Sequence, residues 1–287
     1  MNIQKLEKYL LSQLSNSTVE SYLRTINEFV QVNKDAQKST YLDIVKYMQD
    51  VQQRYNGSTP TRILAAIKKY YEFLVDTGQR KDHPCKNYLV RTSQNRSIQF
   101  DNLFTTTELE MLLKREERYK GMRERNRAMF SLLIYQGMTL KELENIRITD
   151  IDFDEGTIRI RRTLRNNSRT LKMTPKQVVI MFEYKEVREK LLKSKTEKLL
   201  VSARGVGMTG DSINAIVESM KLMFPDRNLN PQTIRQSVIS NWLNTKKKPL
   251  DEVQIMAGHK HPSSTEKYIR KDMRTHVDII NRFHPLG

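Results

Sequence analysis

Residue types that act on phosphate esters lie close together in the last third of the sequence. An arginine sits one turn into a predicted helix in "NPQTIRQS" (230–237), and "AGHKHPSSTEKYIR" (257–270) supplies a glycine, a histidine and a tyrosine. An arginine near a helix N-terminus favours an anion, because the guanidinium and the free backbone N–H groups all donate hydrogen bonds. In chain order, the candidate residues are Arg235, His259 and Tyr268.

The order and spacing of these residues predict nucleophilic chemistry at phosphorus. Gly258 is placed to end a helix and to turn His259 out of it. A tyrosine hydroxyl has a pKa near ~10 and is a poor nucleophile unaided. Arginine and histidine donors lower the barrier by stabilising the charge that develops on the phosphate. Taken singly, each residue has another interpretation: Arg235 as a surface residue and Tyr268 as a packing residue.

Missing motifs exclude proteins that hold nucleotide phosphates in a glycine-rich loop and metalloproteases with an H-E-x-x-H helix. The sequence has no G-x-x-x-x-G-K-[ST], no G-x-G-x-x-G after a strand and no H-E-x-x-H, and "ARGVGMTG" (203–210) is predicted to be a loop. His259 and His261 have no cluster of carboxylates or cysteines near them in sequence, so no metal site is predicted. The one cysteine, Cys85, excludes an intramolecular disulfide and fits a reducing cytosol. No cofactor is expected.

The charge of the chain predicts a polyanionic partner. The 287 residues include 50 Lys and Arg against 33 Asp and Glu, a net charge of +17. Residues 1–100 hold 15 basic and 9 acidic side chains, and the remainder holds 35 and 24. Because both parts are basic, nucleic acid is the predicted partner; a solvated basic protein, such as a ribosome-associated factor, is the alternative. No apolar run approaches the roughly 18 residues of a membrane span, and no signal-peptide core is present, so a cytoplasmic location is expected.

Helical periodicity dominates residues 1–90, which are predicted to form a helical DNA-clamp domain. Apolar residues recur every three or four positions in the segments 17–32, 40–55 and 58–78. In the third segment Tyr70 and Tyr71 fall on the apolar stripe, which favours a place in the core over stacking on bases. Lys68 and Lys69 fall off the stripe and are predicted to contact DNA.

A polar, basic stretch at 79–101 is predicted to be an interdomain linker, followed by a second domain over 102–287. Two T-x-x-E capping boxes, Thr105 with Glu108 and Thr139 with Glu142, open helices in this domain. Between 151 and 173 the period changes to two, which predicts an antiparallel sheet of three short strands; helices resume from 175. The expected fold is therefore mainly α with a small antiparallel β-sheet.

These segments together resemble the tyrosine recombinases (the phage-integrase family). The family's T-G-L-R-I-S-E-L segment and the D-I-D that follows resemble "QGMTLKELENIRITDID", its H-x-x-R resembles "NPQTIR", and its L-G-H resembles "AGH", with the tyrosine nine residues later. The N-terminal part is similar to the family's core-binding domain in "STVESYLRTINEFV", "TPTRILAAIKKYYEFLVDTG" and "HPCKN". The resemblance covers nearly the whole chain.

The resemblance implies a role for each matched residue. Tyr268 would attack a DNA phosphodiester, form a 3′-phosphotyrosyl bond and release a 5′-hydroxyl. Arg235 would contact the non-bridging oxygens, His259 would hydrogen-bond the scissile phosphate, and Glu142 would support the site from behind. The ester keeps the bond energy, so no ATP or metal would be needed. A catalytic domain of the tyrosine-recombinase type is expected over 102–287.

Three positions depart from the family's pattern. Thr139 stands where the family has its first arginine, and Gln232 stands where H-x-x-R has its histidine. Thr139 also fits a helix N-cap, and Gln232 can hydrogen-bond but cannot act as an acid or base near neutral pH. The family's lysine, between the second and third strands, aligns with Thr163 or Leu164. Basic residues able to stand in, and predicted to contact DNA, are Arg162, Arg165 and Lys172. A slow enzyme is expected unless basic neighbours such as Arg147 or Lys141 compensate for the missing donors.

The predicted function is site-specific DNA recombination, as the integrase or DNA-inversion enzyme of a mobile element. The resemblance implies four protomers on two DNA sites, with an accessory DNA-bending protein as a further partner and a nucleoid-associated location. An amphipathic segment at 273–283 would pack on a neighbouring protomer or on its own domain. The alternative function is a non-cleaving DNA-binding protein of recombinase descent, which Thr139, Gln232 and the missing lysine favour.

Overall fold

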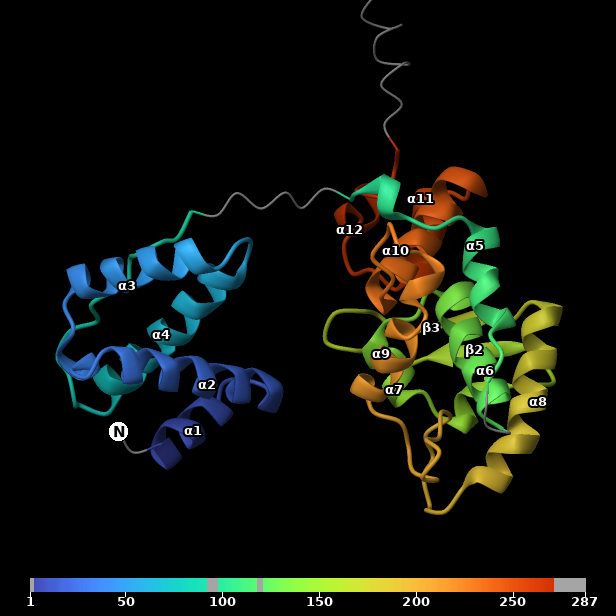
Figure 1. Ribbon diagram of the computed structural model, residues 1–287, viewed down its shortest axis with the longest axis horizontal. Helices are drawn as coiled ribbons and strands as arrows, with labels where there is room; N and C mark the ends of the chain where they lie inside the picture. Colours follow the sequence, from blue (N-terminus) through green and yellow to red (C-terminus); the bar gives the residue numbers. More distant parts are fainter. Residues whose placement is uncertain (1–2, 92–97, 118–120, 271–287) are drawn as a thin grey trace, which may run out of the picture. The chain divides into compact units, whose positions relative to one another are not determined.

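The computed structural model describes residues 3–91, 98–117 and 121–270, in two compact units, Met1–Arg96 and Ser97–Gly287 (Figure 1). The first unit is helical, and the second is helical with one small sheet. The predicted fold, mainly α with a small antiparallel sheet, is confirmed. No helix within these described ranges is long and apolar enough to cross a lipid bilayer. The amphipathic segment predicted at 273–283 lies outside the described residues.

Four helices build the N-terminal unit: α1 (Ile3–Leu11), α2 (Asn16–Val32), α3 (Tyr41–Arg54) and α4 (Thr59–Asp76). Helix α4 contacts each of the other three. Tyr70 and Tyr71 on α4 are fully buried, and the Tyr71 hydroxyl donates to the carbonyl of Ala36 at 2.7 Å. Their predicted place in the core is therefore confirmed, and they are not surface platforms for bases.

The first part of the predicted linker is folded against the N-terminal unit. Cys85 is fully buried in the core of that unit, and Tyr88 and Val90 pack against the same core. The Arg80 guanidinium donates to the carbonyls of Gln37 and Ser39 at 2.8 and 2.9 Å. Sequence periodicity missed this packing because the segment has no regular helix or strand, only single side chains that dock.

The C-terminal unit consists of helices packed around one buried helix, α6 (Met122–Gln136). Its elements are α5 (Thr106–Met111), α6 (Met122–Gln136), α7 (Leu140–Asn145), β1 (Ile151–Asp152), β2 (Thr157–Ile160), β3 (Arg169–Lys172), α8 (Pro175–Leu191), α9 (Gly210–Glu218), α10 (Pro231–Ser240), α11 (Leu250–Ala257) and α12 (Ser263–Glu266). Helix α6 is buried on nearly all sides and packs against α8 and α10. It ends at Gly137, whose φ of 56° lies in the left-handed region that favours glycine.

The three strands form an antiparallel sheet in the order β1-β2-β3. Ile158 pairs with Leu171, and Ile160 pairs with Arg169. Alternate residues of β2 and β3 point inward, so Ile158, Ile160 and Leu171 join the core. Arg169 occupies the fourth inward position, where a charged side chain needs a buried partner.

Candidate active site

Helix α10 holds Arg235 inside the C-terminal unit. The helix begins at Pro231, and Asn230 caps it by accepting a hydrogen bond from the backbone of Thr233 at 2.8 Å. Arg235 is 7% exposed. Its guanidinium donates to the carbonyl of Gly137, just past α6, and to the carbonyl of Ala257, the last residue of α11. Burial lowers the pKa of the guanidinium to about 10, so it stays charged at neutral pH.

The end of α11 delivers His259, as the sequence predicts. Gly258 terminates the helix with a φ of 71°, and the backbone N–H groups of Gly258 and His259 donate back to the carbonyls of Ile255 and Gln254. The His259 Nδ1 lies 2.8 Å from the Thr265 hydroxyl oxygen. The Nε2 nitrogen is therefore the ring atom left for a substrate.

Tyr268 follows the short helix α12 and stacks on His259. The two ring centroids lie 6.2 Å apart, with 14° between the ring planes. The carbonyl of Tyr268 accepts from the Asn244 side chain at 2.8 Å, which ties this segment to the end of α10. Tyr268 is 5% exposed, and burial raises the pKa of its phenol against an opposing effect of Arg235. The structure thus brings Arg235, His259 and Tyr268 to one region, with the tyrosine covered.

Thr139 and Glu142 form the capping box at the start of α7. The Thr139 hydroxyl accepts from the backbone of Glu142 at 3.3 Å, and the Thr139 backbone N–H donates to Glu142 Oε2 at 2.7 Å. The predicted N-cap at Thr139 is confirmed. Glu142 is almost fully buried, so its carboxylate faces the interior.

The buried partner of Glu142 is Arg169, a residue that the sequence analysis did not single out. The Arg169 Nη1 and Nη2 atoms donate to the two Glu142 oxygens at 2.7 and 3.2 Å, and both side chains are 1% exposed. Burial is the largest single effect and raises the pKa of Glu142. The hydrogen bonds and charge of Arg169, the Thr139 backbone N–H and the charge of Arg235 together outweigh burial, so the pKa is lowered. The signal in the sequence was the alternation of β3, which places Arg169 two positions before the inward Leu171.

The hairpin between β2 and β3 docks on the loop that carries His259. The backbone N–H of Asn167 donates to the carbonyl of Gly258 at 2.8 Å, and Asn166 forms an antiparallel bridge with His259. The Asn166 side chain also donates to Glu142 at 3.1 Å. Lys260 extends to the hairpin tip and donates to the carbonyl of Leu164 at 2.8 Å. The hairpin therefore connects Glu142 to the histidine loop.

Protein-family models match both units of the chain. The model described as "Phage integrase family" matches residues 102–275. The chain belongs to the phage integrase family. A second model, described as "Phage integrase, N-terminal SAM-like domain", matches residues 3–78 of this family member. The family predicted from the sequence is confirmed.

Similar proteins in this family carry recombinase names. A tyrosine recombinase XerD of Halalkalibacterium halodurans is 25% identical, with 99% of this chain and 96% of the relative covered. A tyrosine recombinase XerC of Anoxybacillus flavithermus is 26% identical, with 94% and 92% covered. The names of these relatives agree with the predicted enzyme class, a tyrosine-type site-specific recombinase.

Solved structures share the fold of this phage integrase family member. The XerH site-specific recombinase bound to difH substrate superposes with a TM-score of 0.73 at 16% identity, over 96% of this chain and 93% of that one. The Tn1549 transposon integrase in complex with circular intermediate DNA gives a TM-score of 0.69 at 14% identity, over 98% and 99%.

Other residues predicted for this integrase family member lie outside the buried cluster. Gln232 is exposed on the first turn of α10, three residues before Arg235. The hairpin residues Arg162 and Arg165 and the strand residue Lys172 are exposed. In the residues described, the histidines do not join a cluster of three or more His, Cys, Asp or Glu side chains able to hold a metal.

The expected compensating cations, and the two lysines of α4, have partners of their own. Arg147 pairs with Glu197, and Lys141 pairs with Glu144 at 2.8 Å. Both were named as basic neighbours able to compensate for missing charge at the phosphate, but each pairs with a carboxylate. Glu144 lies three residues after Lys141 on α7, and Glu197 precedes Lys198, which is bridged to Arg147. In the N-terminal unit Lys68 donates to the carbonyl of Lys86, and Lys69 pairs with Glu72 at 2.6 Å. The charge of Lys69 is thus partly neutralised before any DNA contact.

His259 should make the folded protein less stable as the pH falls. Burial, then the charges of Arg235, Lys267 and Arg169, lower its pKa to about 4 from an ordinary value of 6.5. Between these values the unfolded chain takes up a proton that the folded ring refuses, so stability falls as pH drops from about 6.5 to 4. Urea unfolding at pH 7 and pH 4.5 should show a smaller acid loss in His259→Gln than in the wild type, by about 1 kcal/mol because the ring is partly exposed.

The matched control for this measurement is His261→Gln. His261 is exposed and lies two residues along the same loop. Its substitution should leave the acid loss at the wild-type value. Equal acid losses in His259→Gln and wild type would contradict a neutral, half-buried His259.

Proposed function

We propose that this protein is a site-specific DNA recombinase that cuts and rejoins duplex DNA through a covalent bond to Tyr268. The observation that carries the proposal is the convergence of Arg235, His259 and Tyr268 from α10, the end of α11 and the end of α12. A buried cation, a neutral imidazole and a phenol in one region form a set of groups suited to phosphoryl transfer without a metal.

The proposed reaction is a transesterification. The Tyr268 oxygen forms a bond to phosphorus as its proton leaves, and the bond to the 5′-oxygen breaks as that oxygen takes up a proton. A 3′-phosphotyrosyl ester and a 5′-hydroxyl result. Attack of a 5′-hydroxyl from another strand reverses these bonds and frees the tyrosine. Arg235 and the Nε2 of His259 would hold the non-bridging oxygens during both steps.

The covered tyrosine implies that cleavage needs a local rearrangement. Tyr268 is 5% exposed, and both terminal nitrogens of Arg235 are bonded to backbone carbonyls. The segment from His259 to Tyr268 would have to shift for the hydroxyl and the guanidinium to reach one phosphate. Asn244, in the helical turn that follows α10, holds this loop through hydrogen bonds with the backbone of Tyr268 and Arg270. Because these bonds hold the loop in place in the free protein, DNA binding is the proposed trigger of the shift.

The covering of Tyr268 also supports the second candidate function, a non-cleaving DNA-binding protein. One experiment separates the two. Duplexes enriched from a random-sequence library on the protein, and sequences flanking its gene, are nicked next to each candidate scissile bond and incubated with the protein. A denaturation-resistant protein–DNA adduct with a free 5′-hydroxyl supports the recombinase. Tight binding with no adduct on any nicked duplex supports the non-cleaving protein.

We infer integration or inversion of a mobile element, by four protomers on two sites, as the setting of this reaction. Two copies of the enriched duplex on one plasmid test it. In inverted orientation they should give inversion of the intervening DNA, and in direct orientation its excision. Cross-linking on the plasmid should give a four-protomer species; recombination by a two-protomer species would contradict this assembly.

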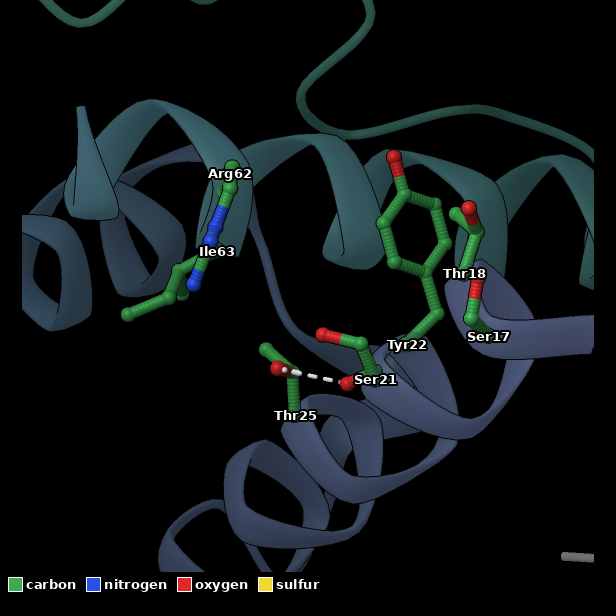
Figure 2. Close-up of a pocket in the computed structure, with 7 residues that line it drawn as sticks. All are labelled: Ser17, Thr18, Ser21, Tyr22, Thr25, Arg62 and Ile63. Atoms are coloured by element: carbon green, nitrogen blue, oxygen red, sulfur yellow. Dashed lines mark hydrogen bonds between the residues drawn. The ribbon is translucent and has the colours of Figure 1, made fainter. Parts of the chain in front are cut away.

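A groove on the N-terminal unit is the proposed DNA-backbone contact there. A pocket of about 390 Å³ lies between α2 and α4 (Figure 2). The Ser21 and Thr25 side chains of α2 lie on the side of Arg62 and Ile63 of α4, and Ser17 and Thr18 lie on the other side of the Tyr22 ring (Figure 2). The lining residues are Ser17, Thr18, Ser21, Tyr22, Thr25, Arg62 and Ile63. Hydroxyls and a guanidinium are common phosphate contacts in DNA-binding proteins.

Replacing Arg62 with alanine should weaken DNA binding by a similar factor for all sequences. Loss of one phosphate contact should reduce the slope of log K against log salt by about 1. Fluorescence anisotropy at several salt concentrations measures both quantities. The matched control is Lys46→Ala, which removes one exposed charge from α3, outside the groove. Equal slopes in Arg62→Ala and Lys46→Ala would contradict a specific contact in the groove.

A further inference from the structure

We propose that Arg169, delivered by strand β3, is a second guanidinium that contacts the scissile phosphate, beside Arg235. This inference rests on the proposed recombinase function and adds a residue to its machinery. Thr139 offers no positive charge to the phosphate, and Arg147 and Lys141 pair with Glu197 and Glu144. Arg169, by contrast, is a cation that pairs with the buried Glu142.

The position of Arg169 is fixed by two independent constraints. Its register opposite Ile160 points it into the protein, and the two-pronged pair with Glu142 sets the plane of the guanidinium. Such a planar fork suits a phosphate, which accepts parallel hydrogen bonds in the same way as a carboxylate. Glu142 is itself held by the backbone of Thr139 and by Asn166.

Arg169 lies directly under the loop that presents His259. A Cβ atom added to Gly258 would come within 2.7 Å of the Arg169 Nη1 and 3.3 Å of its Cδ. Glycine is therefore needed at 258 both for its left-handed backbone and for the close passage of Arg169. The same shift of the His259–Tyr268 segment that uncovers the tyrosine would uncover Arg169.

Unused donors on Arg169 distinguish it from a purely structural arginine. A guanidinium has five N–H donors, and the pair with Glu142 uses one from each terminal nitrogen. The Nε of Arg169 is buried and has no hydrogen-bond partner in the described structure. Arg188, another buried arginine, differs at this atom: its Nε donates to the backbone carbonyls of Lys198 and Leu199 at 3.2 and 2.9 Å. Arg169 thus retains donors for a ligand.

Thr139 and Arg169 both donate to the same oxygen of the Glu142 carboxylate. The Thr139 backbone nitrogen lies 2.7 Å from Glu142 Oε2, and Arg169 Nη2 lies 3.2 Å from that oxygen. An arginine placed at position 139 would begin next to Glu142 and could pair with it. The structure therefore offers a transfer test, in which the guanidinium is moved from β3 to the start of α7.

The test compares adduct formation by three variants on two substrates. Arg169→Lys keeps a cation for Glu142 but lacks the planar fork, and the double variant Thr139→Arg, Arg169→Met moves the guanidinium. Arg161→Lys is the matched control, because Arg161 pairs with Asp150 at 2.8 Å and lysine keeps a cation for that carboxylate, whose side chain is 2% exposed. One substrate has a natural scissile phosphate, and the other has a methylphosphonate that lacks one charged non-bridging oxygen. Thermal midpoints and DNA affinity are measured alongside.

We expect Arg169→Lys to fold and to bind DNA within a few-fold of wild type, but to form the adduct about 10²-fold more slowly. On the methylphosphonate this gap should shrink to less than about ten-fold, since less charge needs stabilising. The double variant should recover at least about ten-fold over Arg169→Lys on the natural phosphate, and Arg161→Lys should match wild type.

Two results would overturn the inference while leaving the proposed function in place. One is an Arg169→Lys variant that cleaves at the wild-type rate. The other is an equal loss on both substrates with no recovery in the double variant, which would assign Arg169 to structure alone. A wild-type protein that never forms an adduct fails at the earlier step, and overturns the proposed function and this inference together.

Discussion

Replacing Tyr268 with phenylalanine is expected to abolish the covalent protein–DNA adduct and to leave the fold intact. The ring packs in the hydrophobic core of the C-terminal unit and stacks on His259, and phenylalanine keeps both contacts. Only the hydroxyl, the proposed nucleophile, is lost. The free energy of unfolding should change by about 1 kcal/mol or less, the usual range for one hydrogen-bonding group. Adduct formation should fall below detection.

Gel analysis of the denatured complex on the nicked duplex measures this effect. The matched control is Tyr135→Phe, because the Tyr135 hydroxyl bonds to Glu110 on another part of the same unit. That variant should form adduct at the wild-type rate. Adduct in Tyr268→Phe would mean that another side chain attacks the phosphate, and mass spectrometry of the linked peptide would name it. DNA affinity, measured in parallel, should be the same for both variants.

Short-range patterns in the sequence predicted much of this structure. The capping boxes at Thr105 and Thr139 form as expected, because their bonds span three residues and depend only on residue type. The helix break at Gly258 follows from glycine's tolerance of positive φ. The alternation in β2 and β3 predicts the three-stranded sheet. A helix that carries Arg235 and a helix that ends just before His259 are also expected from the sequence, and α10 and α11 are those helices.

Long-range contacts account for what the sequence did not predict. Arg169 and Glu142 are 27 positions apart and meet only because the β2–β3 hairpin folds back over α7. An arginine two residues before an inward leucine can equally end a strand at the surface, so its burial depends on this partner. The docking of Cys85 onto the N-terminal core likewise depends on tertiary packing. The burial of Tyr268 depends on the conformation of the whole loop and on the hydrogen bond from the Asn244 side chain to the Tyr268 carbonyl.

Replacing Glu142 with glutamine is expected to cause the largest loss of stability among these variants. Glutamine keeps an oxygen for the Thr139 backbone but carries no charge, so Arg169 is left as a buried cation without a counter-ion. Removing one member of a buried ion pair costs about 3–5 kcal/mol, since the remaining charge has neither water nor partner. Urea unfolding at pH 7 should show this loss in the free energy of unfolding.

The chain provides its own control in the first capping box. Glu108 caps α5 with Thr105 in the same way as Glu142 caps α7, and it also pairs with an arginine, Arg227. The side chains of Glu108 and Arg227 are 29% and 24% exposed, against 1% and 1% for Glu142 and Arg169. Water can therefore solvate Arg227 when its partner is lost, and Glu108→Gln should cost only about 1 kcal/mol.

A double variant tests whether the loss in Glu142→Gln comes from the orphaned charge. Adding Arg169→Met removes the unpaired cation and puts an apolar side chain of similar length in its place, so stability should recover by about 2 kcal/mol or more. Recovery would show that the cost lies in the buried guanidinium. If the double variant is as unstable as Glu142→Gln, the carboxylate instead stabilises the fold through Thr139 and Asn166.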